Sequence, residues 1–584
     1  LLLIDEVAAG LTEQEVEEFI ALVRRLRDAI RKGEPIVVYG DYDVDGVTAT
    51  FQNGSISFVP SVDSVGEFKV VTNPFDSQFG FTMGGVVTSV TRSGANQFHG
   101  GLFEYVQNTR MNANEFNSNR AGIRRQRSNI NTFGGNVNGP IFKNKLFFAY
   151  AYEGIRQSIP DPFTTSIPTP LQRTGDFSQT KQANGQLQVI YDPLTTRADA
   201  TGKLIRDAFA NNVIPANRIN PVAKAVLAYL PAPNAPGDTL GLNNYVNSSA
   251  VPRFLDDFEA HSGRLDYSWS ENTKVFGRMA FNRLDEVRGY RYGNEADPSG
   301  NVPFVRQNYN GVGGVTHTLN TTTVVDARFG VARFTSPGGN TLGSNFDLSK
   351  LGFSSRYISQ ALNHFPQFRF TDYEGLGSGP ARVNPASTVY HFVSSVSKLW
   401  GDHSLKTGFE TRLFRNNVRD PGNANGVFNF TAGFTQQDPL AGASRASGNP
   451  IASFLLGYPA SGNIESRVFP ARQHIAYAGF LQDDWRVRPH LTIAFGLRWD
   501  NETILTDRNN FGPRLALAWD PFSTGKTVVR AGYGIFYSRA LLRTLDDYVL
   551  TSNKLLVDTD NVAAAPLLTT LKFPSVLGAT DPRV

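Results

Sequence analysis

The sequence predicts a mainly β protein, a partial transmembrane antiparallel β-barrel preceded by a short α/β segment. Apolar residues alternate with polar or tiny residues, at the period of a β-strand, in most of the chain after about residue 51. Aromatic residues make up 12% of the chain and often stand at the ends of these runs, as in the aromatic girdles of membrane barrels. Charged residues make up only 18%, and no apolar run is long enough for a transmembrane helix.

The clearest strand is predicted for residues 491–500. Its apolar positions are Leu491, Ile493, Phe495, Leu497 and Trp499, and its polar or tiny positions are Thr492, Ala494, Gly496, Arg498 and Asp500. Similar runs occur at 264–269, 275–282, 405–413, 515–519 and 529–535. Each is about ten residues long, the length that a tilted strand needs to cross a bilayer. A soluble sandwich or propeller alternates too, but strand length, charges opposite a continuous apolar face and long polar loops favour the barrel.

The longest interruption of this pattern covers residues 155–258 and is rich in Pro, Asn, Asp and Thr. A connection of this length inside a compact domain is usually functional, and in an outer-membrane barrel the long loops face the outside. A short helix is predicted within it, from Pro221 to Leu230.

Residues 1–50 have a different layout. Thr12 and Glu15 form a capping box, and apolar residues at helical spacing follow as far as Ile30. An apolar strand is predicted at 35–39, and an acidic loop at 40–46 carries Asp41, Asp43 and Asp45. Carboxylates at the end of a buried strand suit Mg²⁺ or Mn²⁺. An EF-hand is excluded because Gln52 stands at the twelfth loop position and a strand precedes the loop.

Composition excludes several other classes of site. The formal charge of +4 is small for 584 residues and is spread out, so no nucleic-acid partner is expected. The chain has no cysteine, which excludes thiolate metal sites and suits an exported protein. No phosphate-binding loop or serine-nucleophile elbow is present, so no catalytic residue and no cofactor is predicted. The first residues lack the features of a signal peptide, so we expect an exported protein to begin upstream.

Several segments resemble TonB-dependent outer-membrane receptors, and among them the large Oar-like branch that carries a carboxypeptidase-regulatory-like domain before the plug. Residues 62–70, 79–80, 84–94 and 96–100 resemble the end of the plug domain, and 133–148 with 152–156 the start of the barrel. Further matches follow in family order at 173–178, 401–406, 454–457, 482–485, 510–515 and 530–537. The resemblance divides the chain into a plug end at 51–97 and an incomplete barrel at 98–584.

This resemblance implies energised uptake of an unidentified large ligand at the outer membrane. The implied partners are outer-membrane lipid, the TonB complex and an extracellular ligand, and the implied barrel has about 22 strands, wide enough to enclose a plug. Glycines at positions that face the lumen are expected to leave room for the plug. The last residues lack a final amphipathic strand, so we expect an unclosed barrel that neither inserts nor transports alone. An adhesin or structural barrel is the alternative within this class.

Residues 35–50 resemble the first motif of RecJ-type single-strand exonucleases of the DHH phosphoesterase family. The resemblance implies that Asp41, Asp43 and Asp45 help to hold catalytic divalent ions, usually manganese. That family also needs an Asp-His-His motif, and this chain has no adjacent pair of histidines. We therefore expect residues 1–50 to be a fused fragment, with the three aspartates as an orphaned metal motif and exonuclease activity as the alternative function.

Overall fold

The computed structural model describes the chain from residue 85 to residue 538 nearly without interruption, together with shorter stretches on either side. Those stretches are 40–44, 47–48, 61–71, 75–81 and 555–560, and the longer part omits 115, 121, 123, 126, 160–162, 248–253, 300–303, 340, 381–382, 420, 442–445 and 467–470. The helix and strand predicted for residues 12–39 lie outside the described residues.

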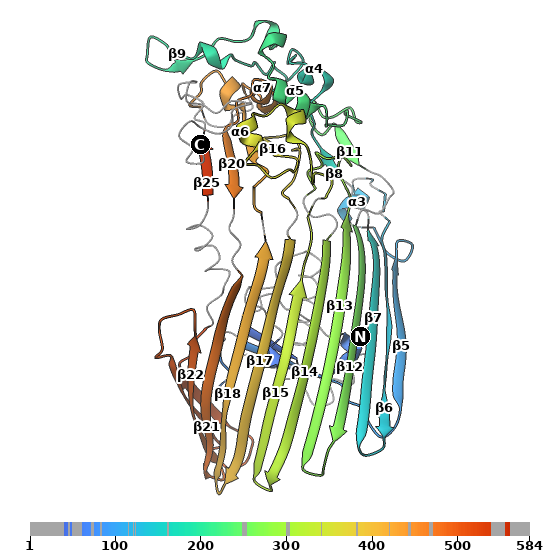
Figure 1. Cartoon of the computed structure of the whole chain (residues 1–584), viewed down its shortest axis with the longest axis vertical. Coiled ribbons are helices and arrows are strands. Elements are labelled where there is room, and N and C mark those ends of the chain that lie inside the picture. Colours follow the sequence, from blue (N-terminus) through green and yellow to red (C-terminus); the bar gives the residue numbers. More distant parts are fainter. Residues whose placement is uncertain are drawn as a thin grey trace.

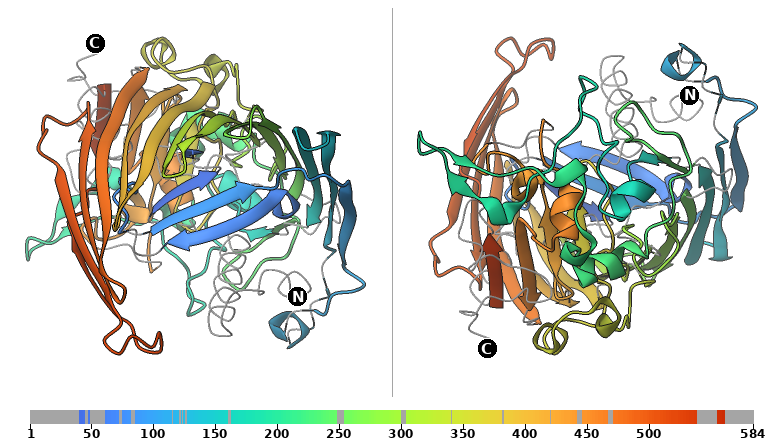
Figure 2. Two further views of the ribbon diagram at one scale, coloured as in Figure 1. Left: turned by 90° about the horizontal axis from the view of Figure 1, so that it is seen from below. Right: turned by 90° about the horizontal axis from the view of Figure 1, so that it is seen from above.

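The largest unit is one sheet of thirteen strands in which every neighbour along the chain pairs antiparallel. We call it the wall. It consists of β5 (His99–Asn108), β6 (Asn129–Phe142), β7 (Leu146–Ile159), β12 (Phe254–Ser268), β13 (Thr273–Arg288), β14 (Phe304–Asn320), β15 (Thr323–Thr335), β17 (Val383–Trp400), β18 (His403–Arg419), β21 (Arg472–Arg488), β22 (Leu491–Glu502), β23 (Phe511–Trp519) and β24 (Val529–Gly534). The wall curves strongly, and its outermost strands β5 and β24 do not pair with each other within the described residues (Figures 1 and 2). The predicted mainly β, partial-barrel fold is confirmed in this form.

Alternation along the wall strands places apolar residues on the convex side. On β13, Met279 is 78% exposed while its neighbour Arg278 is buried on the concave side. The same division on β22 leaves Phe495 and Leu497 exposed and buries Arg498. The predicted two-sided pattern is confirmed, but the strand length was wrong: the central strands have 13 to 18 residues rather than about ten. The apolar stretch is only part of each strand, since the pairing continues beyond it into polar residues at the end that bears the long connections.

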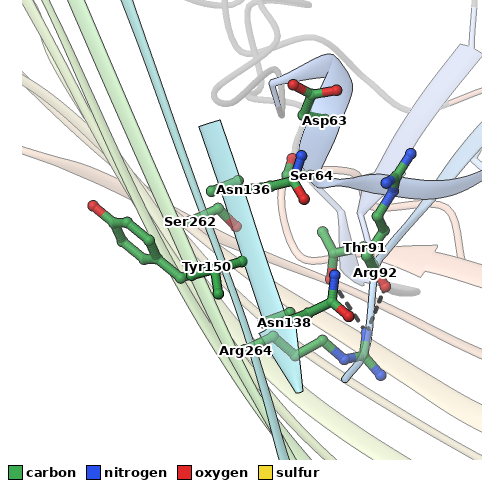
Figure 3. Close-up of a pocket in the computed structure, with 12 residues that line it drawn as sticks. Asp63, Ser64, Thr91, Arg92, Asn136, Asn138, Tyr150, Ser262 and Arg264 are labelled. Carbon is green, nitrogen blue, oxygen red and sulfur yellow. Dashed lines mark hydrogen bonds between the residues drawn. The ribbon is translucent and has the colours of Figure 1, made fainter. Parts of the chain in front are cut away.

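A second, smaller sheet lies on the concave side of the wall (Figure 2, left). This inner sheet has the strand order β2-β1-β4-β3 and consists of β1 (Gly40–Val44), β2 (Val47–Thr48), β3 (Val65–Val71) and β4 (Gly85–Thr91), with the short helix η1 (Val62–Ser64) before β3. Arg264 of β12 anchors the end of β4, because the Nη1 of Arg264 donates hydrogen bonds to Thr91 O at 3.3 Å and to Thr91 Oγ1 at 3.2 Å (Figure 3).

The inner sheet corrects one prediction. Gly40 to Val44 form a strand that pairs in parallel with β4, in the register Gly40↔Gly85 to Val44↔Ser89, whereas a loop was predicted there. Glycine and aspartate favour turns in isolation, but the backbone of this segment is satisfied by the free edge of β4. Tertiary pairing has therefore overridden the local preference.

Four connections between neighbouring wall strands fold together, with β25, into a compact unit beyond one end of the wall (Figure 1). We call this unit the cap; it comprises 163–247, 291–299, 341–380, 421–464 and β25, within the described residues. Its elements are β8 (Phe163–Thr165), α4 (Pro170–Arg173), η2 (Pro193–Thr195), β9 (Arg197–Ala198), β10 (Leu204–Ile205), η3 (Ala210–Asn212), η4 (Ala216–Arg218), α5 (Pro221–Leu227), β11 (Tyr245–Asn247), η5 (Leu348–Leu351), α6 (Ser355–Ile358), β16 (Gln367–Phe370), β19 (Val427–Phe430), η6 (Ala432–Thr435), α7 (Pro450–Leu455), β20 (Ser461–Ser466) and β25 (Leu555–Asp560). The turns at the opposite end of the wall are short, and α3 (Phe116–Arg120) follows β5.

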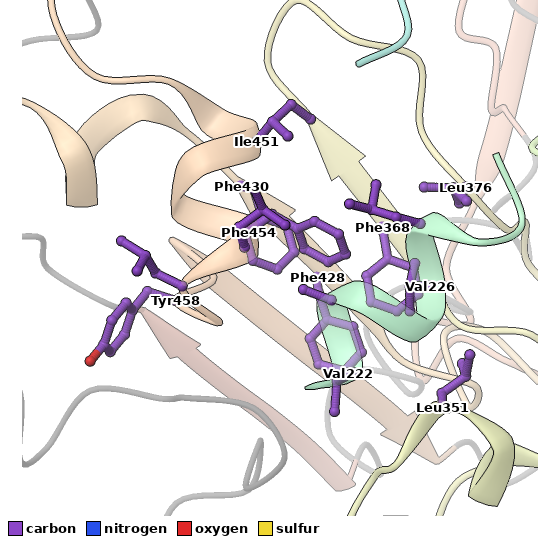
Figure 4. Close-up of a cluster of buried hydrophobic side chains, with 14 of the residues drawn as sticks. Val222, Val226, Leu351, Phe368, Leu376, Phe428, Phe430, Ile451, Phe454 and Tyr458 are labelled. Atoms are coloured by element: carbon purple, nitrogen blue, oxygen red, sulfur yellow. The ribbon is translucent and has the colours of Figure 1, made fainter. Parts of the chain in front are cut away.

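The cap has its own hydrophobic core, built from aromatic residues of separate connections. Phe368 of β16, Phe428 of β19 and Phe454 of α7 are each fully buried and pack around α5 (Figure 4). The predicted helix at Pro221 is confirmed as α5, whose first turn is closed by Asn220 accepting a 2.9 Å hydrogen bond from Val222 N. No helix in the described part of the chain is long and apolar enough to cross a bilayer.

Candidate functional site

The candidate site is the contact between the wall and the segment from Phe75 to Phe81, which precedes β4. We call this the inner segment. The side chain of Arg498 is 0% exposed and reaches it from β22. Its Nη1 donates hydrogen bonds to Gln78 O at 2.9 Å and to Ser77 O at 3.3 Å. A wall side chain thus replaces the backbone partners that a strand neighbour would supply.

Arg498 is held in place by two carboxylates of the wall. Its Nη2 lies 2.8 Å from Glu410 Oε2, and its Nε lies 2.7 Å from Asp500 Oδ1. Glu410 also accepts from Arg412 and forms a 3.1 Å contact with His391 Nε2. Because all of these groups are buried, the pairs compensate charges that would otherwise be costly to remove from water. The result is a rigid cluster that presents its N–H groups to the inner segment.

Arg514 on β23 makes a second set of contacts with the same segment. It donates to Asp76 O at 2.6 Å through Nη1 and to Phe79 O at 2.7 Å through Nη2. Hydrogen bonds from a charged donor to a carbonyl are stronger than bonds between neutral groups. With Arg498, four consecutive carbonyl groups of the inner segment, from Asp76 to Phe79, are bound by the wall.

Two further wall residues bind side chains of the inner segment. Gln482 Oε1 accepts from Ser77 Oγ at 2.9 Å and from Ser77 N at 3.2 Å. Lys406 donates to Gln78 Oε1 and lies 3.8 Å from Asp76 Oδ2. Apart from the bond from Ser77 N, these contacts use side chains of the inner segment, and together with the carbonyl contacts they fix the register of the segment against the wall.

Glycines in the wall make room for the inner segment, as predicted. A Cβ on Gly496 would lie 2.0 Å from Ser77 Oγ, and a Cβ on Gly532 would lie 2.7 Å from the Phe75 ring. Gly80 of the inner segment in turn makes room for a wall side chain, since a Cβ on Gly80 would lie 1.9 Å from Arg498 Nε. The outward-facing Gly263 and Gly277 have no neighbour within 4 Å at the same test position. Close approach therefore explains the glycines on the concave side.

Phe81 closes the contact at its far end. Its ring lies under two guanidinium groups, 5.4 Å from Arg498 and 5.5 Å from Arg412, a cation–π arrangement. Its backbone has φ of 58°, in the left-handed region that phenylalanine rarely adopts. The ring's burial among the wall side chains is what holds this strained conformation.

A cavity of about 460 Å³ separates the inner sheet from the wall beside this contact. Its lining combines charged side chains of the inner sheet, Glu67 and Lys69, with charged side chains of the wall that include Asp326, Arg328 and Arg412. Both signs of charge face the same space, and the cavity is large enough for many water molecules.

The predicted metal residues are only partly described. Asp41 and Asp43 both lie on β1, and Asp45 lies outside the described residues. No group of three or more His, Asp or Glu side chains suited to a metal ion occurs in the described part of the chain. The metal site predicted for Asp41, Asp43 and Asp45 therefore stays a prediction.

The contact between Arg498 and the inner segment was not predicted from the sequence. Alternation at 491–500 placed Arg498 opposite an apolar face, but its partners lie 420 and 421 residues away. The sequence signal that could have indicated this contact is the pair of wall glycines Gly496 and Gly532, since glycine on the polar side of a strand indicates close approach of another chain segment.

Comparison with known proteins identifies the family to which the chain belongs. The model of the outer membrane beta barrel domain matches residues 90–510 and 501–582. The chain is 23% identical over 564 residues to the TonB-dependent transporter Oar of Myxococcus xanthus, which covers 86% of this chain and 47% of that protein. The chain thus spans about half the length of this curated relative.

One solved structure agrees in fold over most of the chain. The outer membrane transporter YddB of Escherichia coli superposes with a TM-score of 0.51 at 11% identity, over 88% of this chain and 56% of that one. The ferric enterobactin receptor PfeA of Pseudomonas aeruginosa gives 0.44 at 13% identity, over 86% and 54%. The family model and the similarity to Oar point to an outer-membrane barrel of the transporter type rather than to an enzyme. The chain belongs to the outer membrane β-barrel family, is located in the outer membrane, and is similar to the TonB-dependent transporter Oar.

Proposed function

We propose that the chain supplies the wall, the end of the plug and the outer cap of a transporter that takes up a large extracellular ligand with energy from a TonB complex. The inner sheet and the inner segment are the plug end in this proposal, and the wall begins with β5 at His99. The supporting observation is that Arg498 and Arg514 bind four consecutive backbone carbonyls of a segment that the wall curves around.

This contact suits a plug that must be both secure and releasable. Each charge-assisted hydrogen bond contributes about 1.5–3 kcal/mol, so the plug end stays seated in the absence of force. Such bonds break one at a time and exchange with water, which an apolar core of the same area would not allow. A pull on the plug would transfer the carbonyls to water and widen the neighbouring cavity of about 460 Å³.

The full-length parent protein in its outer membrane provides the test. Replacement of both arginines (R498Q/R514Q) is expected to unseat the plug end and to admit a glycopeptide antibiotic that porins exclude, without any TonB complex. The exposed Arg530 on β24 gives the matched control R530Q, which should leave the membrane closed. Unchanged sensitivity of R498Q/R514Q would contradict the proposed seat.

The adhesin or structural-barrel alternative makes the opposite prediction about energy. If the unaltered parent protein still takes up its ligand equally well after loss of the TonB complex, then the proposal of energised transport fails and the adhesin or structural barrel is favoured.

The exonuclease alternative predicts manganese-dependent release of nucleotides from single-stranded DNA that the substitution Asp43→Ala abolishes. Neither the comparisons nor the described residues add support for that alternative.

A further inference from the structure

The convex face of the wall carries a polar row near the cap. Tyr309, Arg333, Thr388, Arg415 and Gln473 lie side by side on five adjacent strands, each directly opposite the next in the antiparallel register. Adjacent strands are about 4.8 Å apart, so the backbones of the two arginines on either side of Thr388 are about 10 Å apart. Two flexible side chains at this distance can converge on one small anion.

These side chains point away from the lumen. Arg333 shares the exposed side of β15 with Phe329, and Arg415 shares the exposed side of β18 with Phe409. The next row toward the centre of the wall is Val331, Tyr390, Leu413 and Ile475. The two cations therefore stand at the upper border of an apolar surface, on the side of the wall that bears the cap.

Both arginines keep most of their hydrogen-bonding capacity. Arg333 donates to Thr388 Oγ1 at 3.1 Å, and Arg415 donates from Nε to Gln473 Oε1 at 3.0 Å. The guanidinium of Arg415 also lies 5.5 Å from the centre of the Tyr390 ring, which supports it from below. Within the described residues, neither arginine has a carboxylate within 4 Å. A guanidinium has five N–H donors, so several remain for a ligand.

The neighbouring part of the same face is built differently. On β13, Arg283 donates from Nε to Asp285 Oδ2 at 2.6 Å and from Nη2 to Asp285 Oδ1 at 2.8 Å. On β7, Arg156 is paired with Glu259 of β12 at 2.5 Å. The arginines on β7 and β13 are thus each paired with a carboxylate of the protein, whereas Arg333 and Arg415 are not paired with one among the described residues.

We propose that Arg333 and Arg415 form a binding site for the phosphate group of an anionic lipid in the outer leaflet of the membrane. Guanidinium groups match phosphate oxygens in geometry and in charge, and the apolar row below them would contact the acyl chains of the same molecule. The site is independent of uptake, since it lies on the convex face and shares no residue with the wall's contact to the inner segment.

Lipid binding to the full chain in zwitterionic detergent tests this site. Native mass spectrometry measures retention of phosphatidic acid and of phosphatidylcholine with the same acyl chains, for the unaltered chain and for R333Q, R415Q and R333Q/R415Q. The unaltered chain should prefer phosphatidic acid, and each single variant should lose about tenfold in affinity for it. The matched control is R283Q, which removes an arginine of the same face that is already neutralised.

The outcomes are distinct. A loss of affinity for phosphatidic acid that is confined to R333Q, R415Q and their double variant supports the site, provided that the near-ultraviolet circular dichroism of the five tryptophans is unchanged. An equal loss in R283Q, or no preference for phosphatidic acid, overturns it. Displacement of the lipid by an equal concentration of inorganic phosphate would show that the arginines take free phosphate, which also overturns a lipid site.

Discussion

The guanidinium of Arg498 on wall strand β22 donates a 2.9 Å hydrogen bond to the backbone carbonyl of Gln78, 420 residues earlier in the chain. Two carboxylates, Glu410 and Asp500, hold Arg498 in the orientation that this bond needs. The inner segment is therefore positioned by a charged cluster in the wall, together with the packing of Phe81 against apolar wall side chains such as Val389 and Phe414.

Replacement of Arg498 by methionine should lower the free energy of unfolding by about 3–5 kcal/mol, because it leaves the carboxylates of Glu410 and Asp500 buried without their shared cation. Urea unfolding of the chain in detergent, followed by tryptophan fluorescence, measures the change. The variant R530M removes an exposed arginine and is the control. Equal unfolding midpoints for the two variants would show that Arg498 does not stabilise the wall.

Replacement of Gly496 by valine should displace the inner segment, because a Cβ at this position would lie 2.0 Å from Ser77 Oγ and 2.6 Å from Gln482 Oε1. Limited proteolysis should then cleave the chain near Gln78 faster than in the unaltered protein. The variant G277V adds the same side chain on the convex face, where nothing lies within 4 Å, and should not change the cleavage rate. Identical rates for both variants would rule out the close contact.

Replacement of Phe454 by alanine should unfold the cap before the wall. The Phe454 ring packs 4.9 Å from Phe430 and 5.1 Å from Phe370, and truncation of a buried phenylalanine costs about 3–5 kcal/mol. Hydrogen exchange should rise in cap peptides and stay unchanged in wall peptides. The control L440A truncates a side chain that is 66% exposed. Uniform exchange over cap and wall would mean that they unfold as one unit.

The cap should lose stability in mild acid through His364. Burial lowers the pKa of His364 from 6.5 to about 4, so the folded cap keeps a neutral imidazole that the unfolded chain protonates. The contribution of the neutral His364 to the free energy of unfolding of the cap is complete above pH 6.5. It is lost as the pH falls from 6.5 to about 4, and the loss reaches a limit of about 3 kcal/mol. Cap hydrogen exchange measured across this range should rise in the unaltered chain, and H364Q should remove that dependence. A pH profile that H364Q leaves intact would assign the effect to another group.

The two faces of the wall could be predicted from the sequence, and the contacts across its interior could not. Alternation at 491–500 was sufficient to place Trp499 outside and Arg498 inside, because the side-chain period of a strand is fixed by its geometry. No local pattern identifies the partner of a buried arginine when hundreds of residues separate the two. The wall glycines, read as signs of close approach, gave the nearest correct indication.

The cap shows a different limit. Asn220 followed by Pro221 was enough to predict α5, because an amide cap and a proline in the first turn are local signals. The core of the cap could not be predicted, since Phe368 and Phe454 come from separate connections and lie on elements of only four and six residues, too short to show a period. At β1, the aspartates gave a turn signal that pairing with β4 overrode.

Cross-linking of position 77 to position 482 tests the central claim, that the inner segment is seated against the wall. The chain has no cysteine, so S77C/Q482C in the full-length parent protein introduces the only two thiols within residues 1–584. Gln482 Oε1 lies 2.9 Å from Ser77 Oγ, so a short bifunctional thiol reagent applied to outer membranes should link the two positions and change the mobility of the protein on a denaturing gel. The pair S77C/G277C, with its second thiol on the convex face, should not be linked. Failure of S77C/Q482C to cross-link, or equal linking of both pairs, would contradict the account.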